Sequence, residues 1–194
     1  MPTRVPASTF WLILAACSPT PADEPARILV IGAYPDHRYT GILVRDAAFM
    51  VTVPGFCPDV PASKKNPVFL HTEDDFKRPN PFTPDVVVPI DAVAVRKLDA
   101  LDLTESQLYE WGPWMGDDTD QVPADKPGRR RWLASENLPV FAKLADRFRS
   151  QLVEQLGETR GRAVKYAEAF EVCEYGTQPS KEDLRRIFPF LDGG

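Results

Sequence analysis

The chain has 194 residues, of which 43% are apolar, and a formal net charge of -5. This composition supports a folded core and excludes a chain that is disordered throughout. The mild excess of acids argues against nucleic acid as the main partner, because phosphate binding requires a basic face.

The chain begins with a short apolar run over residues 5–16 that ends in small residues before a cysteine. Its length fits the apolar core of a secretory peptide, about 7–15 residues, and falls short of the roughly 20 residues of a spanning helix. Leu14-Ala15-Ala16-Cys17, followed by Ser18-Pro19, resembles the signal peptide and lipobox of bacterial lipoproteins. The resemblance implies cleavage before Cys17, acyl chains on Cys17, and a lipid-anchored protein in the periplasm or on the cell surface.

This reading divides the chain into three parts. We expect a signal peptide over 1–16, the acylated cysteine and an extended proline-containing tether over 17–26, and a single α+β domain over 27–194. With Cys17 acylated, Cys57 and Cys173 remain as an even pair in a compartment that permits disulfides. No histidine lies near either residue in sequence to activate a thiol, so we predict a structural disulfide between them.

The first half of the domain reads mainly as strands. Short β-branched and apolar runs bounded by proline or glycine are typical of strands. In chain order we expect a strand over 27–33, a turn over 34–38, a hairpin over 41–53, a strand over 67–71, and a surface loop over 74–89 with a short edge strand at 86–88. Residues 91–103 fit both helical and strand spacing.

The second half contains the clearest helix. Apolar residues at spacings of three and four predict a helix over 138–156, capped by Asn137 and ended by Gly157. Before it we expect a short helix that starts with a capping box at 104–107 and stops at Gly112-Pro113, and then an exposed loop over 116–131. For 162–175 we favour a strand over a helix, because the earlier strands need a partner. A terminal helix should start after Ser180.

These elements predict an α+β fold. Its expected form is a small antiparallel sheet, or a partly open OB-like barrel, with one long packed helix and a short C-terminal helix. Fold alone does not fix function, so function must be argued from the site residues.

Few residues point to catalysis. His37 and His71 are the only two histidines, and together with Asp36 they could serve a hydrolase, with or without a metal ion. The chain has no nucleophile-elbow, phosphate-loop or dinucleotide-binding sequence. The acids at 117–120 lack the spacing of a calcium loop, so we interpret them as a solvated loop and leave cation binding open. We predict no catalytic set, no metal and no cofactor.

Trp111, Trp114 and Met115 are the candidate binding residues. Aromatic residues flanked by glycine and proline are typical of a groove or an interface, although the same residues could instead cap the core. We therefore predict a lipid-anchored extracytoplasmic binding or structural lipoprotein without catalytic activity. It would contact the membrane through its acyl chains and bind a protein partner or a small ligand. The alternative is a small periplasmic hydrolase that uses Asp36, His37 and His71.

Overall fold

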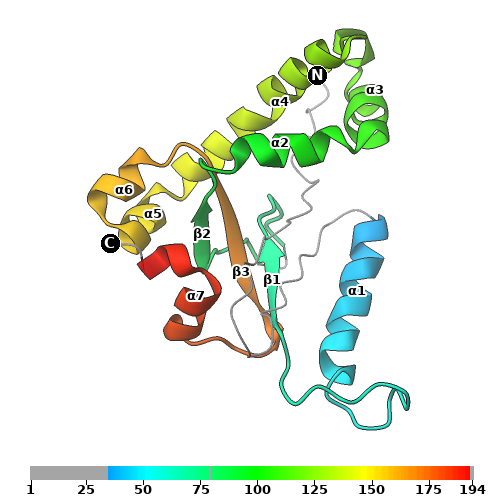
Figure 1. Cartoon of the computed structure of the whole chain (residues 1–194), viewed down its shortest axis with the longest axis vertical. Helices are drawn as coiled ribbons and strands as arrows, with labels where there is room; N and C mark the ends of the chain where they lie inside the picture. Colours follow the sequence, from blue (N-terminus) through cyan, green and yellow to red (C-terminus); the bar gives the residue numbers. More distant parts are fainter. Residues whose placement is uncertain (1–34, 79, 193–194) are drawn as a thin grey trace. The chain divides into compact units, whose positions relative to one another are not determined.

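The structure is a computed structural model that describes residues 35–78 and 80–192 (Figure 1). The predicted signal peptide, Cys17, the tether and the strand over 27–33 lie outside the described residues. Within the first helix, side chains are described from Tyr39 onward, so the side chains of Asp36 and His37 also lie outside.

The described chain has an α+β fold, as the sequence predicts. The α-helices are α1 (Pro35–Met50), α2 (Ala94–Asp102), α3 (Gly112–Gly116), α4 (Lys126–Arg147), α5 (Arg149–Leu156), α6 (Glu158–Ala163) and α7 (Lys181–Ile187). The strands are β1 (Val68–Thr72), β2 (Val86–Pro89) and β3 (Ala167–Gly176). A π-helix η1 (Ser106–Trp111) and two 3-10 helices, η2 (Thr119–Gln121) and η3 (Pro189–Asp192), complete the described elements.

The three described strands form one open sheet in the order β1-β3-β2 (Figure 1). β1 pairs antiparallel with β3, with Thr72 opposite Phe170. On the other side of β3, Asp85 N–H donates to Phe170 O and Ile90 N–H donates to Tyr166 O, at 2.8 and 2.9 Å, which is an antiparallel register. The strand over 67–71 and the edge strand at 86–88 are therefore confirmed. The strand favoured over 162–175 is confirmed from Ala167 onward, while residues 162 and 163 belong to α6.

The described chain packs as two compact units that divide within β2 and β3. One unit comprises residues 87–168, and the other comprises 35–78, 80–86 and 169–192. The buried apolar side chains of the first unit come largely from α2, α4 and α5, and include Leu98, Leu101, Leu133, Phe141, Leu144 and Leu152.

The turn expected over 34–38 and the hairpin expected over 41–53 are wrong, because residues 35–50 form the helix α1. Apolar residues that alternate with shorter ones suggested strands. The helix instead uses Val44 and Ala48, which are four residues apart and lie on one face. They pack against Phe69 and Cys173 in the second unit. Pro35 fits the first turn of this helix because its missing N–H would have no partner there.

The exposed loop expected over 116–131 is also largely replaced by helix. α4 begins at Lys126, where Asp125 accepts the Gly128 N–H at 2.8 Å and so caps the helix. The helix expected over 138–156 is therefore longer, and it is divided at Phe148 into α4 and α5. Asn137 is not a cap: it is buried inside α4, and its Nδ2 donates to Leu133 O at 2.8 Å. Gly157, with φ of +80°, ends α5 as predicted.

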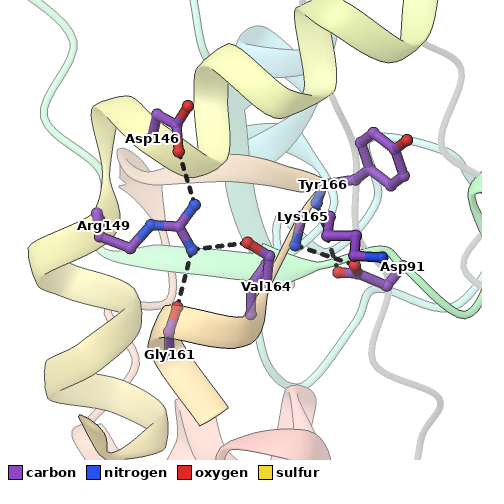
Figure 2. A network of polar contacts seen from close by, with 7 residues as sticks. All are labelled: Asp91, Asp146, Arg149, Gly161, Val164, Lys165 and Tyr166. Atoms are coloured by element: carbon purple, nitrogen blue, oxygen red, sulfur yellow. Dashed lines mark hydrogen bonds and ion pairs between the residues drawn. The ribbon is translucent and has the colours of Figure 1, made fainter. Parts of the chain in front are cut away.

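Arg149 fixes the turn that leads from α6 into β3 (Figure 2). Its Nη1 donates to Gly161 O at 2.9 Å and to Val164 O at 2.7 Å. One residue further, the carboxylate of Asp91 accepts the Lys165 N–H at 2.9 Å. The side chains of Arg149 and Asp91 thus form hydrogen bonds with backbone carbonyl and N–H groups between α6 and β3, where neither the helix nor the sheet supplies partners.

The C-terminal helix starts after Ser180, as the sequence predicts. Ser180 Oγ accepts the Asp183 N–H at 3.1 Å, and Asp183 Oδ2 accepts the Ser180 N–H at 3.0 Å, which is a complete capping box. The side-chain and backbone hydrogen bonds from Ser180 also hold the pKa of Asp183 below its usual value. Phe188, just past the helix, stacks on Phe170 with ring centroids 6.2 Å apart.

Cys57 and Cys173 are not joined by a disulfide. Cys57 is exposed, whereas Cys173 is buried beside Phe69 and Ala48. The even number of cysteines remaining after Cys17 suggested a bridge, but this structure places both residues as free thiols. Among the described residues no helix is both long and apolar enough to span a bilayer.

Candidate binding surface

The histidine-based site is only partly described. His71 is half-buried on β1, while the side chains of its proposed companions Asp36 and His37 lie outside the described residues. Burial lowers the pKa of His71, Arg45 lowers it further, and Asp74 opposes the shift. Across the described part of the chain, no group of three or more histidine, cysteine or carboxylate side chains is placed to hold a metal ion.

The acidic segment at 117–120 has a structural role. Asp117 adopts a left-handed conformation with φ of +59° and ends α3, a conformation that aspartate tolerates better than most residues. Asp118 Oδ1 accepts a hydrogen bond from Gln121 Nε2 at 2.5 Å. The segment therefore reads as a helix end joined to a short 3-10 turn.

A π-turn precedes this helix end and explains why Gly112-Pro113 does not stop the helix. The Gly112 N–H donates to Gln107 O, five residues back, as in a π-helix. A Cβ atom on residue 112 would lie 2.8 Å from Gln107 O, so the close turn requires glycine. Pro113 then occupies the first turn of α3, where it needs no N–H.

Trp111, Trp114 and Met115, which we call the Trp–Met surface, lie together because they are three and four residues apart. Their exposed fractions are 36%, 71% and 57%. Leu108, Tyr109 and Pro113 are buried and attach the same segment to its unit. The structure thus brings the three sequence-predicted binding residues onto an exposed helical face and not into a loop.

Tyr109 anchors this segment to its neighbours. It is 5% exposed, and its hydroxyl donates to Asp102 Oδ1 of α2 at 2.5 Å. The Arg129 guanidinium of α4 lies 5.3 Å from the Tyr109 ring centroid, and the Trp132 ring lies 5.9 Å away. Burial and the Asp102 carboxylate raise the pKa of Tyr109, so the phenol keeps its proton. The Trp–Met surface therefore projects from a supported element.

A small pocket of about 150 Å³ lies beside Tyr109. Its lining combines two carboxylates, two cationic side chains and the phenol: Asp102, Glu105, Tyr109, Ala124, Lys126 and Arg129. Typical pockets for drug-sized ligands start at about 300 Å³, so only a group of a few atoms fits here. Sequence reasoning missed this pocket because its residues have no common motif and come from three separate segments.

No family profile, curated protein or solved structure matches this chain. The candidate sites are therefore judged on their own geometry. Among them, the Trp–Met surface exposes large apolar side chains on one supported face, whereas the pocket is small and the histidine site is incompletely described. The Trp–Met surface is the strongest candidate for binding.

Proposed function

We propose that the protein is a lipid-anchored extracytoplasmic binding protein without catalytic activity, located in the periplasm or on the cell surface. It holds a protein partner against the Trp–Met surface. The observation that carries this proposal is the exposure of Trp114 and Met115, 71% and 57%, on the same helical face as Trp111. Tryptophan and methionine are enriched in the buried centres of protein interfaces.

The supported position of the surface favours binding over a packing role. Asp102 and Arg129 hold Tyr109 in place, so the Trp–Met surface is already ordered before a partner binds. Such preorganisation lowers the entropic cost of association. A protein partner is favoured over a small ligand because the adjacent pocket, at about 150 Å³, admits only a few atoms.

The first test concerns the anchor. Cys17→Ser removes the thiol that lipidation needs, so we expect the protein to leave the membrane fraction or to accumulate as an uncleaved precursor. Fractionation of cells and the mass of the mature N-terminus measure both effects. Cys57→Ser is the matched control and should fractionate as the natural chain does. Unchanged fractionation of Cys17→Ser would refute lipid anchoring.

The second test concerns the surface. A photo-crosslinking amino acid placed at Trp114 should give a discrete adduct in intact cells, while the same group at Tyr175, which is 52% exposed, should not. Adding Met115→Ala to the Trp114 variant should remove most of the adduct, because truncation of an interface residue of this kind costs about 2 kcal/mol or more, roughly thirtyfold in Kd. Equal adducts at both positions, or an adduct insensitive to Met115→Ala, would contradict the proposal.

We keep a small hydrolase using Asp36, His37 and His71 as the second candidate. Its support is the half-buried His71, whose lowered pKa favours the neutral imidazole that a general base requires. Under this alternative, His71→Gln abolishes hydrolysis of a test ester by the purified chain. We also retain the partly open OB-like barrel as a proposal, in which the strand expected over 27–33 would extend the three-stranded sheet.

A further inference from the structure

Acidic residues are concentrated in the stretch of sequence that carries the Trp–Met surface. Residues 98–125 contain eight acids and neither lysine nor arginine. The acids are Asp99, Asp102, Glu105, Glu110, Asp117, Asp118, Asp120 and Asp125. Because the whole chain has a net charge of only -5, the segment that carries the surface accounts for all of its net negative charge.

Half of these acids have structural tasks. Asp99 pairs with Arg130, and Asp102 accepts the Tyr109 hydroxyl. Asp118 accepts from Gln121, and Asp125 caps α4. These four carboxylates are therefore already used within the fold.

The other four acids lie on the same segment and face solvent. The side chains of Glu105, Glu110, Asp117 and Asp120 are exposed and make no hydrogen bond or ion pair within the part of the chain that the structure describes. Glu110 directly precedes Trp111 and lies one helical turn before Trp114, and Asp117 follows Met115 by two residues. Exposed apolar side chains and uncommitted carboxylates thus occur together on one short segment.

We propose that the partner presents a basic segment to this surface, with lysine or arginine side chains flanking apolar ones. This inference rests on the proposed function of the Trp–Met surface and specifies the chemistry of its partner. A cationic head can lie over a tryptophan face and pair with a nearby carboxylate, while its aliphatic stem covers apolar area. Complementary charge also speeds encounter and excludes acidic partners.

The probes are two synthetic amphipathic peptides that differ only in charge, one of leucine and lysine and one of leucine and glutamate. They are titrated calorimetrically into the purified full chain. The neutralised variant carries Glu110→Gln, Asp117→Asn and Asp120→Asn, since asparagine tolerates the left-handed conformation at 117. The matched control removes the same charge elsewhere, with Glu136→Gln, Glu154→Gln and Glu174→Gln, all at exposed positions.

We expect the lysine peptide to bind the natural chain and the glutamate peptide not to bind. The neutralised variant should bind the lysine peptide about tenfold more weakly, because three exposed ion pairs are lost. Affinity should also fall as salt is raised, since exposed charges are screened. The control variant should keep the affinity of the natural chain within about twofold.

The outcomes separate the two proposals. Three results would overturn the proposal of a basic partner. The lysine peptide does not bind, the two peptides bind equally, or the neutralised and control variants lose the same affinity for the lysine peptide. If Trp114→Ala weakens the binding of both peptides equally, the surface binds by apolar contact alone. The proposal of a basic partner then fails, while the proposed function stands. Failure of the proposed function itself is read from the cellular crosslink at Trp114.

Discussion

His71 is a titratable side chain whose surroundings disfavour its charged form. It is half-buried on β1, and burial is the largest cause of its lowered pKa. Arg45 adds a repulsive positive charge, which Asp74 partly offsets. The folded protein therefore keeps His71 neutral at pH values where a histidine in the unfolded chain, with a pKa of about 6.5, takes up a proton.

The stability of the natural chain should therefore contain a histidine-dependent loss as the pH falls below about 6.5. Below that pH the unfolded chain binds a proton that folded His71 resists, so protonation favours unfolding. His71→Gln should remove this contribution, and Arg45→Gln should weaken it by removing one cause of the shift. Urea denaturation between about pH 5.5 and 7.5 measures both. Identical pH slopes for the natural chain and His71→Gln would contradict this assignment.

At the scale of elements, short segments depend on side chains that complete their backbone bonding. α6 has six residues, too few for a helix to be stable by itself in water. Arg149 of α5 binds the carbonyls of Gly161 and Val164 and so holds α6 and the start of β3 in place (Figure 2). A planar guanidinium offers several donors in fixed directions, whereas an ammonium is a point charge.

Arg149→Lys should lower the free energy of unfolding by about 1.5–3 kcal/mol, the usual value of hydrogen bonds to charged groups. It should also speed hydrogen exchange of the amides over 158–166, because the carbonyls of that segment lose the guanidinium that donates to them. Arg162→Lys is the matched control: among the described residues Arg162 forms an exposed i,i+4 ion pair with Glu158 alone, worth about 0.5 kcal/mol or less. Equal effects of the two substitutions would exclude a special role for Arg149.

The start of the C-terminal helix was predictable because neighbouring residues specify it, whereas the capping box expected at 104–107 does not form. The capping box at Ser180 and Asp183 involves residues three apart, and the structure confirms the helix that it starts. α1 was mistaken for a hairpin because its buried face is defined by contact with Phe69 and Cys173, which are distant in sequence. The three Trp–Met residues were identified from their types alone, but the π-turn that exposes them follows from a backbone contact between Gly112 and Gln107.

At the scale of the whole molecule, each compact unit has its own core, and the unit of residues 87–168 contains a nearly buried ion pair. The side chains of Lys97 and Glu168 are 12% and 11% exposed and pair with each other. Lys97 Nζ also lies 4.7 Å from the centroid of the Phe141 ring. Sequence reasoning could not find this pair, because its members come from α2 and β3.

Removing one member of the Lys97–Glu168 ion pair should destabilise the fold far more than replacing both members. Glu168→Gln removes the carboxylate that pairs with Lys97, and we expect the free energy of unfolding to fall by about 3–5 kcal/mol, a large share of the 5–15 kcal/mol typical of a domain. Lys97→Met combined with Glu168→Leu should recover most of this loss, because apolar groups of similar size need no counterion. Urea denaturation of the single and double variants measures the coupling. Additive losses would show that the pair is not coupled.

The π-turn at Ser106–Trp111 also makes this region tolerant of one change in chain length. A π-turn accommodates one residue more than an α-turn, so deletion of Glu110 would let the segment close as ordinary α-helix. The later residues would keep their direction around the axis, because the turn itself absorbs the missing residue. Trp114 and Met115 would stay exposed, and Pro113 would stay packed. A single-residue deletion inside α4 would instead rotate every later side chain of that helix by about 100°. Deletion of Glu110 should therefore destabilise the protein far less than a deletion inside α4.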